Sequence, residues 1–251
     1  MKTRLWRGVI LFSVVLLAGA GRLDAAPLDV CQPTATENWA TASNWSCGHA
    51  PTGADAVTIP LGVTLTLSAD GDAGDLTLAT PGTRVSLGAG VTLNIYGTLV
   101  TTGATTSATI AGEGRVRMVG GSRSLFAPNW GAGSTGLRLE IALDNGAVGS
   151  SNQAIKGGQI LVSSGTYSTT ADVRPDDGAA NTGRLDIAAG ATLITAGNIE
   201  RTATNGTQAS SIIVSGTLAS SGAYISANTI TIANGGLLRV RRNTGLNIAG
   251  A

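Results

Sequence analysis

From Val57 onward, hydrophobic and polar residues alternate in short runs that are separated by glycine. Alternation with a period of two is typical of half-buried β-strands, and outside the N-terminal segment no stretch shows a 3.6-residue hydrophobic stripe. One pattern recurs four times: two alternating apolar positions, a glycine corner, and then resumed alternation. The four copies run over 57–65, 85–93, 185–193 and 230–238, with corners at Gly62, Gly90, Gly190 and Gly235.

This repeated corner motif predicts a strand, a tight bend and a second strand. Its recurrence favours an all-β chain folded as a right-handed parallel β-solenoid, in which each turn stacks on the turn before it. The first two corners are 28 residues apart and the last two are 45 apart. If 45 residues make two turns, a turn holds about 22 residues and three short strands. A β-sandwich is the alternative fold, because two packed antiparallel sheets also give short alternating strands.

Residues 1–26 have the pattern of a Sec-type signal peptide. Basic residues Lys2, Arg4 and Arg7 precede an apolar run over 9–17, and small residues follow it. The run is shorter than the roughly 20 residues of a membrane span, so we expect cleavage and no membrane span in the mature chain. An uncleaved anchor helix is the alternative. The predicted location is extracellular or on the outer cell surface, with the periplasm as the second choice.

The charge balance of the mature chain argues against one class of partner. Removing residues 1–26 leaves 12 basic and 14 acidic side chains. Nucleic-acid binding needs a concentrated basic face, and the only basic cluster, Arg239, Arg241 and Arg242, would be split between two faces of a strand. We therefore expect no nucleic-acid partner.

Residues 27–56 differ in composition from residues 57–251, where the predicted solenoid repeats lie, and we expect them to cap the first turn. They hold both cysteines, and an even count in an exported protein favours a Cys31–Cys47 disulfide. With His49, the cysteines offer three soft ligands without a fourth, so no metal site is expected. Trp39 and Trp45 would cover the first strand edge, with stacking on sugar rings as the alternative.

Two stretches, 122–136 and 171–183, interrupt the alternation and are predicted to be loops projecting from the solenoid wall. Such loops are where binding residues would sit, and they are also where a neutral insertion would be tolerated. The candidate ligand-contact residues in these loops are Trp130, Arg174, Asp176 and Asp177. The alternative role of the N-terminal segment adds Trp39 and Trp45 as candidates.

The stretch Trp39…Asn44-Trp45-Ser46-x-Gly48-x-x-Pro51-x-x-x-Asp55-x-Val57-x-Ile59 resembles the opening of bacterial surface β-helix proteins, such as autotransporter passengers and secreted adhesin repeats. The resemblance is clear over residues 39–120. In the remainder, only the general pattern of short runs separated by glycine is similar. It implies a β-helix at the cell surface and carries no catalytic residue with it. In contrast to that family, no membrane barrel or sorting tail follows, which predicts a truncated frame or a further solenoid or partner chain at the C-terminal edge.

No residue pattern points to catalysis, a cofactor or a resident metal. A Ser-His-Asp arrangement would need His49, the only histidine, and no nucleophile elbow accompanies any serine. Asp70, Asp72 and Asp75 are interpreted as a solvated turn, with calcium binding as the alternative. The enzyme alternative is a polysaccharide lyase or glycoside hydrolase with Arg174, Asp176 and Asp177 in one groove.

The sequence thus predicts an exported β-helix protein with a structural or adhesive role, or a passenger fragment of a larger adhesin. Its expected partners are glycans or cell-surface proteins. The polysaccharide-active enzyme is the alternative function.

Overall fold

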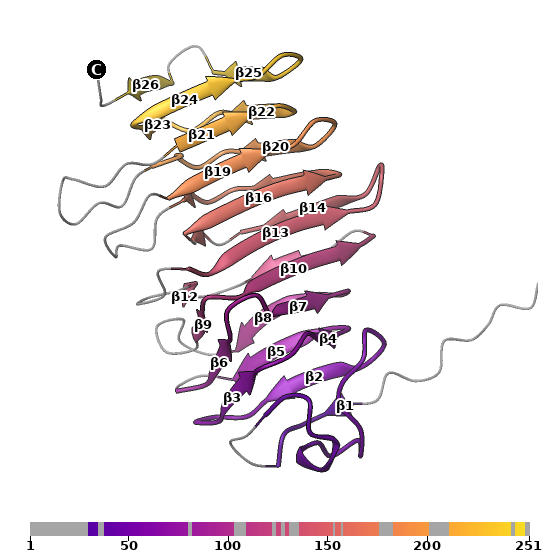
Figure 1. Ribbon diagram of the computed structural model, residues 1–251. Coiled ribbons are helices and arrows are strands. Elements are labelled where there is room, and N and C mark those ends of the chain that lie inside the picture. Colours follow the sequence, from indigo (N-terminus) through magenta and orange to yellow (C-terminus); the bar gives the residue numbers. More distant parts are fainter. Residues whose placement is uncertain are drawn as a thin grey trace, which may run out of the picture.

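The chain forms a parallel β-solenoid in which short strands of successive turns stack along one axis (Figure 1). The computed structural model describes residues 30–34, 38–79, 82–102, 109–121, 124–126, 129–130, 136–152, 154–156, 158–175, 183–200, 211–241 and 244–248. The predicted signal peptide, residues 1–26, lies outside them. Every pairing between the strands named below is parallel, which confirms the solenoid and excludes the β-sandwich.

The strands form three walls, and most turns contribute one strand to each. Wall 1 is a sheet of ten strands, in the order β1 (Val30–Cys31), β2 (Ala56–Ile59), β5 (Leu76–Ala79), β8 (Leu99–Thr102), β11 (Ser124–Phe126), β14 (Val148–Ser151), β17 (Thr166–Thr169), β20 (Thr192–Thr195), β22 (Thr217–Ser220) and β25 (Leu237–Val240). Wall 2 is a sheet of eight strands, β4 (Gly71–Ala73), β7 (Thr92–Ile95), β10 (Arg115–Gly120), β13 (Arg138–Leu143), β16 (Gln159–Ser164), β19 (Arg184–Ile187), β21 (Ser211–Val214) and β24 (Thr229–Ile232).

Wall 3 consists of smaller sheets. Four strands pair in its first part, β3 (Thr64–Leu67), β6 (Arg84–Leu87), β9 (Thr109–Gly112) and β12 (Asn129–Trp130), followed by the pairs β15 (Ile155–Lys156) with β18 (Val173–Arg174) and β23 (Tyr224–Ala227) with β26 (Gly245–Ile248). The predicted three strands per turn are therefore confirmed. The length of a turn varies around the predicted value. Ser151 pairs with Thr169 across a short turn, whereas Thr169 pairs with Thr195 across a longer one.

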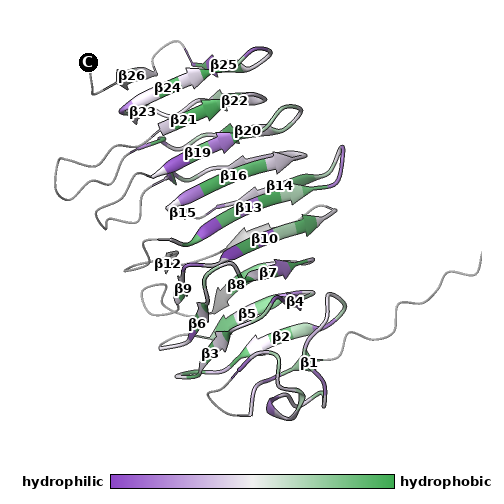
Figure 2. Ribbon diagram, viewed as in Figure 1, coloured by the Kyte–Doolittle hydropathy of each residue, from purple (hydrophilic) through white to green (hydrophobic). Residues whose placement is uncertain are grey.

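The core runs through the middle of the coil, because the alternate residues of each strand point inward. On wall 2, Leu93, Val116, Leu139, Ile160 and Leu185 form one column in register, and each is at most 1% exposed. Figure 2 shows hydrophobic residues recurring along the strands of adjacent turns. Burying such a side chain contributes about 1.5–3 kcal/mol relative to leaving it exposed, so the stacked aliphatic columns stabilise the coil turn by turn.

The four predicted glycine corners are confirmed. Gly62, Gly90, Gly190 and Gly235 have φ between 72° and 83°, a region that side chains with a Cβ rarely adopt. A fifth corner follows β13 at Gly146, with φ 81°. The sequence motif did not include this corner, because Gly149 stands where the other copies have an apolar residue.

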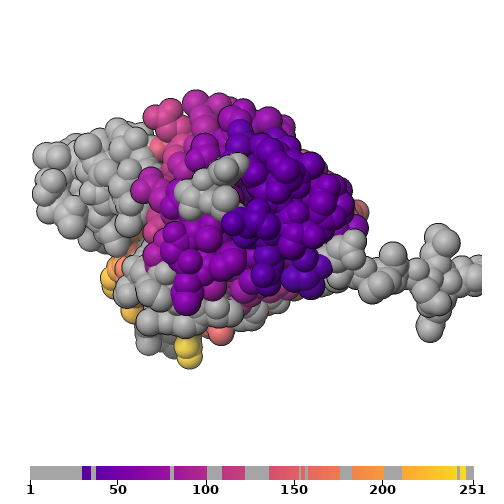
Figure 3. All heavy atoms as spheres, turned by 90° about the horizontal axis from the view of Figure 1, so that it is seen from below, coloured from indigo at the N-terminus to yellow at the C-terminus, as the bar shows by residue number. Residues whose placement is uncertain are grey.

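The N-terminal segment packs against the first turn. The predicted disulfide between Cys31 and Cys47 is present, and β1 extends wall 1 beyond β2. The backbone N–H of Trp39 donates to the carbonyl oxygen of Thr66 at 2.9 Å, so this segment also covers the outer edge of β3. Figure 3, seen from this end, shows the described part of the N-terminal segment, in indigo, packed over the coil.

Trp39 and Trp45 belong to the core at this end, where they are 1% and 3% exposed. Their ring centroids lie 4.9 Å apart in an edge-to-face arrangement, and the Trp45 indole N–H donates to the Trp39 carbonyl oxygen at 2.7 Å. The prediction that these two side chains contact a ligand is therefore wrong, because both are buried in the core and expose no ring face to a sugar.

The predicted projecting loops contain strands of the coil. Within 122–136 the chain forms β11 and β12, and within 171–183 it forms β18. The alternation in these strands is too short to be recognised in sequence, because β12 and β18 have only two residues each. Residues 131–135 and 176–182 lie outside the described residues.

At the other end of the coil, several apolar side chains of the last described turn are exposed: Ile232, Leu237, Val240 and Leu246 are between 40% and 51% accessible. None of the helices among the described residues has the length and hydropathy to cross a membrane.

Candidate functional site

A cluster of charged side chains lies on the outer face of wall 3, where three successive turns place polar residues side by side. Val173, Ile199 and Ile225 pair in parallel across these turns and are buried. Because neighbouring residues on a strand point to opposite faces, their flanking residues point outward. These outward residues, Asp172, Arg174, Glu200 and Tyr224, are called the Arg174 cluster below.

Arg174 joins two acidic side chains within this cluster. Its Nη2 lies 3.0 Å from Asp172 Oδ2 and 2.5 Å from Glu200 Oε1. The three side chains are between 15% and 28% exposed, so water reaches the ion pairs from one side. The Tyr224 hydroxyl donates a short hydrogen bond to the second oxygen of Glu200. The cluster therefore carries two carboxylates, one guanidinium and one phenol.

Backbone hydrogen bonds fix the acidic side of the cluster. The N–H of Asn198 donates to Asp172 Oδ1 at 2.9 Å. One turn further on, the N–H of Ala223 donates to Asn198 Oδ1 at 2.9 Å. Side chains at equivalent places in two turns thus each accept a backbone donor of the next turn, which holds Asp172 in place opposite Arg174.

The protonation of Tyr224 follows from its partner. The hydrogen bond to Glu200 is the largest cause, followed by the negative charge of that carboxylate, and both raise the pKa of Tyr224 above its usual value. At neutral pH the phenol therefore keeps its proton and acts as a donor. The cluster can offer carboxylate oxygens as acceptors and a tyrosine hydroxyl as donor to a bound polar ligand.

The structure changes the sequence interpretation of Arg174. Its predicted neighbours, Asp176 and Asp177, lie outside the described residues. Among the described residues, the carboxylates that contact it are Asp172 and Glu200, which the sequence reasoning did not single out. A turn of 26 residues at this place could have indicated Glu200, since it stands opposite Arg174 one turn later, but the predicted turn held about 22 residues.

A second charged cluster lies on the outer face of wall 2. Glu140 is 7% exposed, and its carboxylate contacts Arg115 Nη1 at 3.0 Å and Arg117 Nε at 3.4 Å. Ser163, which stands at an irregularity in the pairing of β13 with β16, donates to Glu140 Oε1 at 3.0 Å. The sequence reasoning did not identify this cluster, because its members come from three separate turns.

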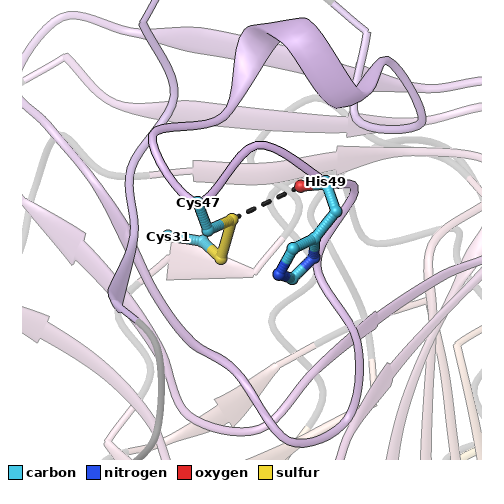
Figure 4. Close-up of side chains that lie close together, drawn as sticks. All are labelled: Cys31, Cys47 and His49. Carbon is cyan, nitrogen blue, oxygen red and sulfur yellow. Dashed lines mark hydrogen bonds between the residues drawn. A yellow bond between two sulfur atoms is a disulfide. The ribbon is translucent and has the colours of Figure 1, made fainter.

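Figure 4 shows Cys31, Cys47 and His49, the only group of three or more potential metal-ligating side chains among the described residues. The two sulfurs are bonded to each other, so neither is a thiolate ligand. The Cys47 Sγ lies 3.3 Å from the His49 carbonyl oxygen, and the His49 Nδ1 lies 3.0 Å from the Ala50 carbonyl oxygen. The group is a disulfide with a neighbouring histidine.

Asp70, Asp72 and Asp75 brace neighbouring turns. Asp70 Oδ1 accepts the Thr92 N–H at 2.7 Å, and Asp75 Oδ1 accepts the Thr98 N–H at 2.6 Å. Asp72 Oδ1 accepts the Asn94 side-chain amide at 3.0 Å. Each carboxylate thus bonds to the next turn, and the three do not form a close group of metal-ligating side chains, which argues against the calcium alternative. The side chain of Trp130 lies outside what the structure describes, so its contact with a ligand stays a prediction.

Comparison with known proteins gives no family for this chain. No protein-family model matches it, and searches among curated proteins and solved structures find no similar chain.

Proposed function

We propose that this chain is an exported β-solenoid with a structural or adhesive role at a bacterial cell surface or in the surrounding medium, and that glycans are its partners. The observation that carries the proposal is a hollow of about 380 Å³ on wall 1. Its lining includes the hydroxyl and amide side chains of Ser150, Asn152, Ser168 and Thr170, together with Ile194.

The chemistry of this hollow suits a neutral sugar. Hydroxyl and amide groups both donate and accept hydrogen bonds, as sugar hydroxyls do. Ile194 is 44% exposed, so an apolar surface stands beside the polar groups for the C–H face of a sugar ring. Pockets that combine apolar surface with a few polar groups are typical of small-ligand sites.

The repetition of wall 1 extends this surface. Thr166, Thr192 and Thr217 form one column in register, one threonine per turn. Strands in a sheet lie about 4.8 Å apart, so the column offers a hydroxyl at a regular interval. A polymer that lies along the solenoid axis would meet the same chemistry at several turns.

Two features support export. The Cys31–Cys47 disulfide is of a kind that persists in oxidising compartments outside the cytoplasm. Residues 1–26 have the pattern of a Sec signal peptide. Fractionation of the producing cells tests this part: recovery of the protein in the cytoplasm with reduced cysteines contradicts export.

A binding experiment tests the glycan part. The purified protein is titrated with neutral dextran oligosaccharides and with cell-surface polysaccharide, and compared with an Ile194→Ser, Ser168→Ala double variant. We expect the variant to bind at least about tenfold more weakly, because it loses an apolar contact and a hydrogen bond. Thr77→Ala, on the same wall but outside the hollow, is the matched control. No binding by the unmodified protein, or equal binding by the double variant, contradicts the proposal.

The Arg174 cluster favours a second candidate, a polysaccharide-active enzyme. Asp172 Oδ2 and Glu200 Oε1 contact the same nitrogen at 3.0 and 2.5 Å. Those oxygens are therefore closer together than the roughly 6.5–9.5 Å between the carboxyls of inverting glycosidases, and nearer the spacing of retaining enzymes. The test is the release of reducing-end sugars from polysaccharide, which Glu200→Gln should abolish. Absence of any product with the unmodified protein contradicts this candidate.

A further inference from the structure

Three arginines occupy neighbouring outward positions on wall 2. Arg115 and Arg117 belong to β10 and Arg138 to β13, and Arg115 pairs with Arg138 in register while Arg117 pairs with Glu140. Like charges directly opposite each other on adjacent strands repel. The fold therefore places two guanidinium groups in one column, where an anion between them would be stabilised.

The acidic groups nearby offset only part of this charge. Glu140 is shared by Arg115 and Arg117, and among the ion pairs of the described residues none involves Arg138. Glu113 lies close to Gly136, but no ion pair among the described residues joins it to Arg115 or Arg138. Three guanidinium groups thus face two carboxylates, which leaves a local positive excess.

A groove of about 360 Å³ lies beside this excess charge. Arg115, Arg138 and the acidic Glu113 line it, together with Gly90, Gly114 and Gly136. A Cβ on Gly114 would come within 2.5 Å of the Leu87 Cβ and 2.6 Å of the Val91 carbonyl oxygen, so this position accommodates only glycine. The groove volume is at the lower end of the range typical of small-ligand sites.

We propose that this groove binds the acidic group of a carboxylate- or sulfate-bearing sugar, with Arg138 and Arg115 holding the anion. The inference rests on the proposed glycan-binding function and adds the class of sugar and the place where its charge is bound. It concerns a different wall from the hydroxyl-lined hollow around Ile194.

The geometry of arginine suits this ligand. A guanidinium group has five N–H donors in a planar fork and binds carboxylate or sulfate oxygens in pairs. Arg115 uses Nη1 toward Glu140, and its side chain is 42% exposed, which leaves further donors facing solvent. An anion bridging Arg115 and Arg138 would also relieve the repulsion between them, so binding should weaken as salt increases.

The test is calorimetric titration of the full protein with three probes: alginate oligosaccharides, which carry carboxylates, dextran sulfate oligosaccharides, which carry sulfates, and neutral dextran oligosaccharides of similar length. We expect at least one acidic probe to bind more tightly at about 50 mM than at about 200 mM salt. Arg138→Gln should weaken that binding about tenfold or more, because a charge-assisted contact is lost. The two acidic probes distinguish carboxylate from sulfate recognition.

Two further variants keep the test interpretable. Arg239→Gln, an exposed arginine of β25 on wall 1, removes the same charge away from the groove and should leave acidic-probe binding unchanged. Arg138→Lys keeps the charge but loses the planar fork, and should give intermediate affinity. Thermal unfolding of each variant confirms that the fold is retained.

The outcomes separate this inference from the proposed function. The groove is overturned, and the glycan proposal stands, under two conditions. Neutral sugars bind and this binding is lost in the Ile194→Ser, Ser168→Ala variant. Acidic sugars either do not bind or bind Arg138→Gln as tightly as the unmodified protein. Acidic binding lost in Arg138→Gln but retained in Arg239→Gln supports the groove. Binding of neither kind of sugar overturns both.

Discussion

Tyr167 and Gly149 stand directly opposite each other on β17 and β14, and the tyrosine ring fills the space that a side chain at position 149 would need. A Cβ at Gly149 would lie 2.7 Å from Tyr167 Cδ2 and 2.9 Å from Leu143 Cδ1. Tyr167 is fully buried in the core, and its hydroxyl donates to the Ser150 carbonyl oxygen at 3.2 Å. One turn therefore replaces the usual aliphatic pair with a glycine and an aromatic ring.

This complementarity predicts that Gly149→Ala destabilises the protein. The added methyl group has no room, and overpacking a core of this kind costs about 1–3 kcal/mol. Urea unfolding of the variant measures the loss. Combining Gly149→Ala with Tyr167→Leu should cost less than the sum of the two single changes, because the smaller side chain releases the clash. Additive effects would contradict the proposed contact.

At the glycine corners, a substitution should lower stability through the backbone conformation and not through a clash. Gly190 has φ 79°, and no atom lies within 4 Å of the place that a Cβ would take, so Gly190→Ala meets no clash and loses stability only through its backbone conformation. That conformation costs about 1–2 kcal/mol for a residue with a Cβ. Gly190→Asn should cost less, because asparagine tolerates the left-handed region. Chemical unfolding of both variants compares them.

Gly216 is the control for this corner. It does not carry the positive φ of the corner glycines, but a Cβ there would lie 2.3 Å from the carbonyl oxygens of both Ala188 and Ala191. Because this clash involves backbone atoms, Gly216→Ala should destabilise more than Gly190→Ala. The reverse order would show that the corner conformation is the stronger constraint.

Because the Cys31–Cys47 disulfide closes a loop in the N-terminal segment, its reduction should lower the stability of the protein. Cys31 and Cys47 are 16 residues apart, and closing a loop of about this size stabilises by about 3 kcal/mol in the chain-entropy model. We expect the Cys31→Ser, Cys47→Ser variant to unfold at a lower temperature than the oxidised protein. The reduced unmodified protein serves as the comparison, and equal melting temperatures for the oxidised and reduced forms would contradict the prediction.

Glu140 is predicted to stabilise wall 2 by offsetting arginine charge. Glu140→Gln keeps the size of the side chain but leaves Arg115 and Arg117 without their shared carboxylate. Hydrogen bonds to charged groups contribute about 1.5–3 kcal/mol, so the free energy of unfolding should fall by an amount of that order. The loss should shrink in high salt, because screening weakens the repulsion between the arginines. Unfolding curves at low and high salt test both statements.

Two tyrosines predict that stability falls at alkaline pH. Burial raises the pKa of Tyr167, and the hydrogen bond to Glu200 raises that of Tyr224. Each tyrosine with a raised pKa in the folded state stabilises the protein fully below its pKa in the unfolded state, which is about 10. This stabilisation is lost as pH rises from there toward the pKa in the folded state.

Urea unfolding between about pH 8 and pH 11 measures this dependence. The unmodified protein should lose stability above about pH 10, and Tyr224→Phe should lose less over the same interval because its contribution has been removed. An unchanged pH dependence in both Tyr224→Phe and Tyr167→Phe would contradict the assignment to these residues.

The repeating part of the fold could be predicted from the sequence because its causes are local. Alternating residues such as those of 57–65 determine which side of a strand is buried, and a glycine at Gly62 or Gly190 permits the corner that joins two strands. An even pair of cysteines, Cys31 and Cys47, predicted the disulfide. These signals depend only on neighbouring residues or on a single pair, so the all-β solenoid and its three strands per turn followed from them.

Contacts between turns could not be predicted, because they depend on the length of each turn. The turns vary in length, so Glu200 reaches Arg174, and Ser151, Thr169, Thr195 and Ser220 meet as a buried column of hydroxyl groups on wall 1. A shift of one residue in register would send these side chains to the other face. Local sequence therefore determined the strands and corners, whereas stacking of unequal turns decided which side chains meet, including both charged clusters and the glycine–tyrosine pair.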